Sequence, residues 1–197
     1  MEAIILASSS PRRQDILKKL NIPYKVMIPD IDESRIAGIE PAKLPEYLAA
    51  KKVEAIVRQL QDGQEITWVL GADTVVVMDG TVYGKPADRA QANRFLHELQ
   101  GRTHQVITSL ALFNGKFFFL STRTCVSSVT MAAMTDDEIE AYLDTGEWHG
   151  VAGGYRVQEL GSCFIRKIDG SSSAVAGLPI FELYDMLKEQ GYLLFAE

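Results

Sequence analysis

The segment from Ala7 to Arg13, with the sequence ASSSPRR, most strongly constrains the fold of this chain. An apolar run, Ala3–Leu6, precedes it and an amphipathic stretch follows it. This order predicts a strand, a tight loop of small residues and a helix N-terminus. Ser10 is a favoured N-cap residue, and Pro11 suits the first helical position because proline lacks an N–H there.

Two arginines, Arg12 and Arg13, follow in the first turn of this expected helix. The helix dipole already makes that turn positive, so each cation there is disfavoured by about 0.3–1 kcal/mol. Together with the hydroxyls of Ser8 and Ser10 and the free backbone N–H groups, the arginines predict an anion receptor. We interpret the segment as a polyphosphate cradle. The alternative is a capped surface helix that merely begins with two arginines.

Composition limits the possible partners. The 197 residues correspond to one domain, or one domain with a small lobe, and a hydrophobic content of 47% is enough for a packed core. A net charge of −6 argues against a nucleic-acid polymer as partner. No apolar run reaches about 18 residues and no signal peptide opens the chain, so we expect a cytoplasmic protein without a membrane span. Cys125 and Cys163 are expected to be buried, reduced thiols.

Candidate acids occur at two places. Asp73 lies within the apolar run 66–77, which predicts a buried strand. An ionised carboxylate there costs several kcal/mol unless it is paired or binds a metal, which favours a functional role. Asp32 and Glu33 follow the strand expected at 24–28 and form either a solvated turn or a site for a hard cation. The three histidines, His97, His104 and His149, are expected to be structural or at the surface.

Basic and glycine-rich segments complete the candidates. Lys51 and Lys52 lie on a helix expected over 44–60, where a solvent-facing pair is the usual interpretation. Lys85 is held between a glycine and a proline, which would aim its ammonium group at a phosphate. The segment 150–158 is either a base-recognition loop or a plain surface loop.

The remaining pattern predicts an α/β domain. Two long strands flank Asn114-Gly115, and a shorter strand is expected over 162–168, followed by a polar turn at 169–173. Helices are expected after Asp88, Thr135 and Pro179.

Six segments in this order resemble the Maf family of nucleoside triphosphate pyrophosphatases. They are Leu6–Arg13, Asp32-Glu33, Gly71–Thr74, Gly84–Pro86, Tyr155–Gln158 and Gly177–Pro179. The resemblance covers nearly the whole chain. It implies a single domain, 1–197, of two lobes with a central cleft. Its fold would be an elongated, mixed, mostly antiparallel sheet flanked by helices, as in the inosine triphosphate pyrophosphatases.

The resemblance also implies a reaction and a set of roles. A nucleoside triphosphate would be hydrolysed between its α and β phosphates, with Mg²⁺ or Mn²⁺ as cofactor. Asp73 and Glu33 match the family's catalytic and metal-binding acids. The phosphate-binding residues would be Ser8, Ser10, Arg13, Lys52 and Lys85, and Lys85 would also take part in catalysis.

Base preference follows from three further positions. Arg12, Thr74 and Gln158 are similar to those of the branch that acts on dTTP and UTP. The chain departs from the family at Val151, where many members have a lysine. A homodimer is expected from the resemblance alone. Two alternatives remain: a housekeeping pyrophosphatase for modified nucleotides, and a nucleotide-binding regulator of cell division that does not turn its ligand over.

Overall fold

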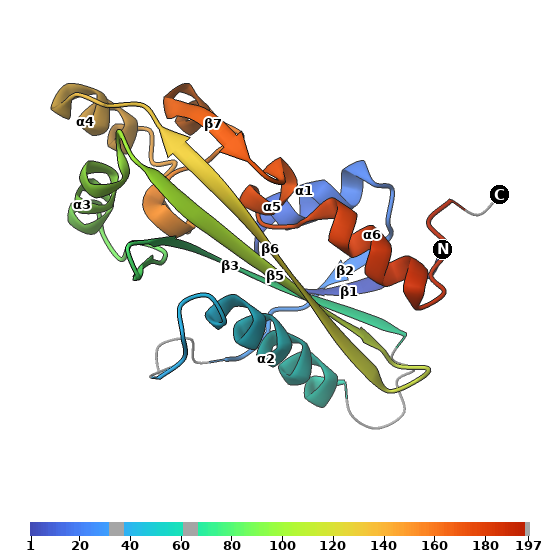
Figure 1. Cartoon of the computed structure of the whole chain (residues 1–197). Helices are drawn as coiled ribbons and strands as arrows, with labels where there is room; N and C mark the ends of the chain where they lie inside the picture. The colour runs from blue at the N-terminus through green and yellow to red at the C-terminus, as the bar shows by residue number, and fades with distance from the viewer. Residues whose placement is uncertain (32–37, 61–66, 196–197) are drawn as a thin grey trace. The chain divides into compact units, whose positions relative to one another are not determined.

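The computed structural model of the chain describes residues 1–31, 38–60 and 67–195 (Figure 1). Strands and helices of these ranges form an α/β protein. The strands are β1 (Ile4–Ala7), β2 (Tyr24–Val26), β3 (Trp68–Met78), β4 (Thr81–Tyr83), β5 (Thr103–Asn114), β6 (Phe119–Met131) and β7 (Ile165–Asp169). The α-helices are α1 (Pro11–Lys19), α2 (Leu44–Gln59), α3 (Arg89–Leu99), α4 (Asp136–Asp144), α5 (Ser172–Val175) and α6 (Ile180–Glu189). Two 3₁₀ helices, η1 (Ala152–Gly154) and η2 (Leu160–Phe164), connect α4 to β7.

The strands form a mixed sheet. They pair in the order β2-β1-β3-β5-β6-β7, with β4 paired to β3. Strand β1 is parallel to both β2 and β3, whereas β4 is antiparallel to β3 and β7 is antiparallel to β6. The expected α/β class with a mixed sheet and flanking helices is therefore confirmed.

The chain divides into two compact units. Unit 1 comprises Met1–Asp73, Thr108–Cys125 and Gly177–Glu197, and unit 2 comprises Thr74–Ile107 and Val126–Ala176. The division falls inside β3, β5 and β6, so each of these strands contributes residues to both units.

In unit 1, α2 packs on one face of the strands through a cluster of buried apolar side chains. Alternation along β3 directs Val69, Gly71 and Asp73 to the same face. Figure 1 shows α2 on one side of the unit 1 strands and α1 and α6 on the other. The cluster under α2 contains Ala7, Ala49, Val53, Ile56, Leu60, Val69, Ala111 and Phe113.

In unit 2, the helices begin where their caps predict. Asp88 caps α3 by accepting a hydrogen bond from the Gln91 N–H at 2.7 Å. Thr135 and Glu138 form the complete capping box of α4, as the sequence predicts. The apolar faces of both helices contribute to the core of this unit.

Three local expectations are wrong in whole or in part. The strand predicted over 162–168 begins only at Ile165, because Leu160–Phe164 form η2. The polar turn predicted at 169–173 leads into the short helix α5. Cys163 is exposed and Cys125 is half-buried, so the expected burial of both thiols is wrong, although neither cysteine forms a disulfide. The expected N-cap of α1 is confirmed as Ser10, with Pro11 as the first helical residue, although the Ser10 hydroxyl makes no capping hydrogen bond.

None of the helices in the described ranges has the length and apolar character that a membrane span requires.

Candidate functional site

The serine loop in unit 1 joins the end of β1 to the start of α1. The Ser8 hydroxyl accepts hydrogen bonds from the Ser10 N–H at 3.2 Å and from the Arg13 Nη1 at 3.0 Å. Ser8 thus closes the loop, and the N-cap residue Ser10 leaves the first-turn N–H groups without a side-chain cap. The Ser10 N–H is therefore already bonded to Ser8, whereas the uncapped first turn offers its N–H groups to an anion.

Arg13 is fixed by its partners. Its side chain is buried, and its Nε donates to the Gly177 carbonyl at 2.8 Å while Nη1 donates to Ser8. These two bonds set the plane of the guanidinium group beside the serine loop. Arg13 therefore supplies a positive charge at a defined position and also ties the loop before α6 to the loop before α1.

Gly71 explains how α2 comes close to the sheet. A Cβ atom at this position would lie 2.5 Å from the Ala49 carbonyl oxygen and 2.8 Å from the Val53 Cγ2. Only glycine permits this approach of helix to strand. Lys52 precedes Val53 on α2, and Asp73 lies two residues beyond Gly71 on the same face of β3. The close contact therefore places the lysine over the aspartate.

Lys52 and Asp73 form a buried ion pair. The Lys52 Nζ donates to the Asp73 Oδ1 at 2.6 Å, and the two side chains are 7% and 9% exposed. Burying either charge alone would cost several kcal/mol, so each ion depends on the other. This pairing confirms that Asp73 needs a partner and shows that the solvent-facing interpretation is wrong for Lys52. It holds only for Lys51, which is half-exposed and pairs with Glu54 at 2.8 Å.

The ion pair lies on β3 near the point where the neighbouring strand β1 ends and the serine loop begins. Ala7 of β1 is in register with Gly71 of β3. Ser8 follows directly on one strand, and Asp73 lies two residues further on the other. Unit 1 thus brings together Ser8, Ser10, Arg13, Lys52 and Asp73, which the sequence predicted separately. A buried carboxylate, two fixed cations and a helix N-terminus are suited to bind and polarise a phosphate group.

In unit 2, the segment Gly84–Pro86 packs against η1. The Gly153 N–H donates to the Gly84 carbonyl at 3.1 Å. A Cβ atom on Gly154 would lie 3.7 Å from the Pro86 Cγ, and Gly154 has a φ of +73° that favours glycine. These contacts fix the backbone on both sides of Lys85, whose side chain is exposed. Val151, where the resemblance leads us to expect a lysine, is buried.

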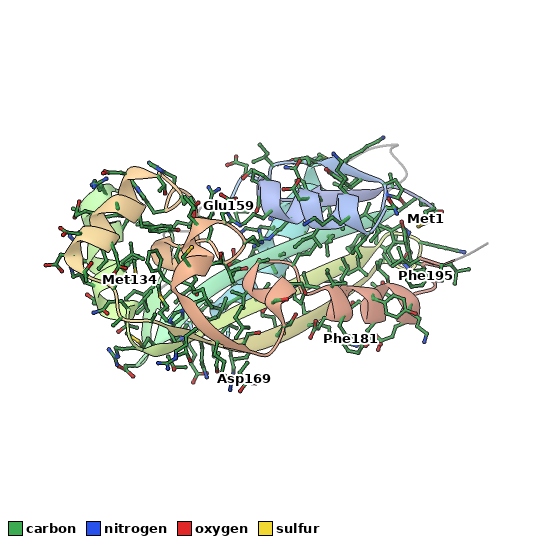
Figure 2. All side chains as sticks on the ribbon, turned by 90° about the horizontal axis from the view of Figure 1, so that it is seen from above. Met1, Met134, Glu159, Asp169, Phe181 and Phe195 are labelled. Carbon is green, nitrogen blue, oxygen red and sulfur yellow. The ribbon has the colours of Figure 1, made fainter. Side chains whose placement is uncertain are left out.

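The Tyr155–Gln158 segment is anchored at its first residue. Tyr155 is buried, and its hydroxyl lies 2.7 Å from the His104 Nε2. Burial lowers the pKa of His104 to about 4, so the imidazole is neutral near pH 7. His104 is therefore structural, as expected. Gln158 is exposed, and Glu159 after it lies at the surface of unit 2 (Figure 2).

The remaining predicted residues are placed on their elements. Arg12 lies in the first turn of α1 and Thr74 in β3, and both are half-buried. Asp32 and Glu33 lie outside the described residues. Among the residues described, no three His, Cys, Asp or Glu side chains gather as a metal site.

Two glycines contribute to the site and lie in segments that carry the family resemblance, but the sequence analysis assigned neither of them a role. Gly71 acts through its contact with α2, and Gly177 through the carbonyl that Arg13 holds. Gly177 has a φ of +106°, which orients that carbonyl in a way few other residues would permit. Both contacts join residues far apart in the chain, so no local spacing reveals them.

The family model and the most similar relatives identify the same family. Residues 3–190 match the family model described as Maf-like protein. The chain is 41% identical over 192 residues to "dTTP/UTP pyrophosphatase" of Pelotomaculum thermopropionicum, covering 98% of each chain. It is 40% identical over 189 residues to the protein of the same name from Shigella dysenteriae, covering 95% of this chain and 92% of the relative.

A solved structure, the Ham1 protein of Staphylococcus aureus, is similar over 66% of this chain and 72% of its own, with a TM-score of 0.46 and 18% identity. The family model spans nearly all of the chain and includes the serine loop, the Lys52–Asp73 pair and the Gly177 loop. The chain therefore belongs to the Maf-like protein family.

Proposed function

We propose that the protein hydrolyses nucleoside triphosphates, preferentially dTTP and UTP, between the α and β phosphates to give the monophosphate and pyrophosphate. The observation that carries this proposal is the buried Lys52–Asp73 pair beside the end of β1, from which the serine loop and Arg13 follow. The names of the relatives supply the substrate class.

The described residues divide the work of phosphate binding and proton transfer. Lys52 holds the Asp73 carboxylate through Oδ1, which leaves Oδ2 as the oxygen suited to take a proton from an attacking water. The guanidinium of Arg13 and the ammonium of Lys85 would neutralise the charge that grows on the pyrophosphate leaving group. Ser8 and Ser10 would orient the phosphate oxygens at the start of α1.

A divalent cation, Mg²⁺ or Mn²⁺, is part of the proposal. The described residues offer one carboxylate here, Asp73, and Glu33 is the second candidate. This donor set fits Mg²⁺, which binds through one or two carboxylates and takes its other ligands from phosphate oxygens and water. When bound, the cation would polarise the phosphate oxygens and offset their charge.

Base choice would rest on Arg12, Thr74 and Gln158. Hydrogen-bonding sites reject bases that lack the matching groups by large factors, because a buried donor or acceptor is then left unpaired. The prediction for Arg12 and Arg13 differs accordingly: the first would choose the base and the second would hold phosphate.

A nucleotide panel tests the proposal and separates it from its alternatives. Turnover is measured for the common triphosphates, methylated pyrimidine triphosphates and 7-methyl-GTP with Mg²⁺ or Mn²⁺, scoring pyrophosphate and orthophosphate separately. We expect pyrophosphate release with the highest kcat/KM for dTTP and UTP. Higher kcat/KM for a modified nucleotide would favour the housekeeping alternative. Tight binding with negligible turnover would favour the regulator.

We also propose that the protein is a cytoplasmic homodimer and that it binds no nucleic-acid polymer. Light scattering of the purified protein would measure the oligomeric state. A mass of one chain at micromolar concentration would contradict the dimer.

A further inference from the structure

The loop from Arg156 to Gly161 carries Gln158 at its exposed middle. Its two ends lie against each other, because a Cβ atom on Gly161 would overlap the Arg156 carbonyl oxygen and lie 3.0 Å from the Arg156 nitrogen. The Ser162 N–H donates to the Glu159 carbonyl at 2.9 Å, which tightens the second end. Four residues thus form a closed turn on a narrow base.

Glu147, in the connection after α4, holds the second end of this loop. Its carboxylate is 9% exposed, with Oε1 accepting from the Leu160 N–H at 3.0 Å and Oε2 from the Gly161 N–H at 3.1 Å. These N–H groups open η2 and have no partner within that helix. These two hydrogen bonds hold the start of η2 firmly, because breaking them would leave a buried carboxylate oxygen or a buried N–H group without a partner, at a cost in free energy.

Tyr142, on the inner face of α4, holds the first end. Its hydroxyl accepts a hydrogen bond from the Arg156 N–H at 3.0 Å and lies against Gly161. Burial, together with the neighbouring Glu147 carboxylate, raises the pKa of Tyr142, so the phenol stays protonated. Tyr142 and Glu147 therefore hold both ends of the loop through main-chain atoms.

The Arg156 side chain adds a third restraint on the same base. Its Nη1 lies 3.2 Å from the Glu159 Oε1, and its Nη2 donates to the His149 carbonyl at 3.4 Å. The main chain on both sides of the apex, where Val157 and Gln158 lie, is thus held in place.

We propose that Tyr142 and Glu147 are positioning residues for base recognition: they fix the direction in which Gln158 presents its amide to a pyrimidine edge. This inference rests on the proposed function. Thymine and uracil present a carbonyl oxygen at C4 and an N–H at N3, whereas cytosine presents an amino group and a bare nitrogen. Because the main chain that carries Gln158 is held in place, its amide approaches the base edge from one direction, whereas a loop that could shift would let the amide match either pattern.

The experiment compares kcat/KM for UTP and CTP, which share sugar and triphosphate and differ only at the base edge. The variants are Glu147→Gln, Tyr142→Phe, Gln158→Ala and the double variant Glu147→Gln/Gln158→Ala. Asp137→Asn, on the exposed face of α4, is the control for Glu147. Tyr192→Phe is the control for Tyr142, because it deletes another buried hydroxyl, which donates to the Glu2 carbonyl at 2.8 Å in unit 1.

We expect each of the three single loop variants to lower the UTP/CTP ratio about five- to twenty-fold, mainly through KM for UTP. The kcat for UTP should change less than about three-fold, and both controls should keep the wild-type ratio. The double variant should match Gln158→Ala alone, since Glu147 acts through Gln158. Thermal unfolding identifies any variant that fails to fold, and Tyr142→Phe then serves in place of Glu147→Gln, with Tyr142→Phe/Gln158→Ala as the double variant.

Three results would overturn the inference: an unchanged ratio in folded Glu147→Gln and Tyr142→Phe, an unchanged ratio in Gln158→Ala, or additive losses in the double variant. A wild-type protein that releases no pyrophosphate from UTP would instead refute the proposed function.

Discussion

Replacing Lys52 by methionine tests the buried ion pair directly. The substitution keeps the length of the side chain and removes its charge, so Asp73 is left without its partner at a position where it is 9% exposed. Removing one member of a buried pair costs about 3–5 kcal/mol in the free energy of unfolding. For a chain of 197 residues, 1 kcal/mol corresponds to about 2–4 °C, so Tm should fall by roughly 6–20 °C.

The neighbouring residue offers a matched control. Lys51 forms an ion pair of similar length, 2.8 Å, with Glu54, but these side chains are 41% and 37% exposed. Such a pair contributes less than about 1 kcal/mol, so Lys51→Met should lower Tm by no more than about 4 °C. Both variants remove one lysine charge. A larger fall in Tm for Lys52→Met than for Lys51→Met would therefore be the effect of burial.

Thermal unfolding measures Tm and urea unfolding measures the free energy of unfolding. Both are followed by circular dichroism and by tryptophan fluorescence, which reports on Trp68 in unit 1 and Trp148 in unit 2. The double variant Lys52→Met/Asp73→Leu should recover most of the lost stability, because two apolar side chains leave no buried charge without a partner. It should remain inactive. Equal destabilisation by Lys52→Met and Lys51→Met would refute the reasoning.

Three further predictions concern other parts of the molecule. Gly71→Ala should lower the free energy of unfolding by about 1–3 kcal/mol and lower kcat, because the new methyl group pushes α2 away from β3. Urea unfolding and a turnover assay measure the two effects. His104 is protonated more readily when unfolded, since its pKa falls from about 6.5 to about 4 on folding. Stability should therefore fall by about 3 kcal/mol as pH drops from 7 to 4, and urea titrations of His104→Gln should lack this component. Arg12→Ala should change the UTP/CTP ratio of kcat/KM, whereas Arg13→Ala should lower activity on every nucleotide; identical behaviour would contradict separate roles.

The sequence predicts those elements that depend on neighbouring residues. Asp88 and the Thr135–Glu138 capping box begin their helices as expected, because a cap bonds to N–H groups two or three positions away. The strand over 66–77 is found as β3, since a continuous run of β-branched residues suits a buried strand. The need of Asp73 for a partner also follows from the sequence, because desolvation of a carboxylate is a local property.

The partners themselves are not encoded locally. Lys52 and Asp73 are brought together only by the packing of α2 on β3, which Gly71 permits, so the spacing of Lys51 and Lys52 indicates two surface lysines. The strand predicted at 162–168 is wrong over its first three residues for a similar reason: Glu147 binds the first N–H groups of η2 from outside the segment. Sequence pattern alone shows neither the helix that covers a strand nor the carboxylate that caps a turn.

The central claim is hydrolysis at the α–β bond with Asp73 as the essential carboxylate. The most direct measurement is ³¹P NMR of dTTP incubated with Mg²⁺ and either the wild-type protein or Asp73→Asn. We predict equal amounts of dTMP and pyrophosphate from the wild type, and almost no product from a variant that remains folded. Formation of dTDP and orthophosphate, or full turnover by Asp73→Asn, would contradict the claim.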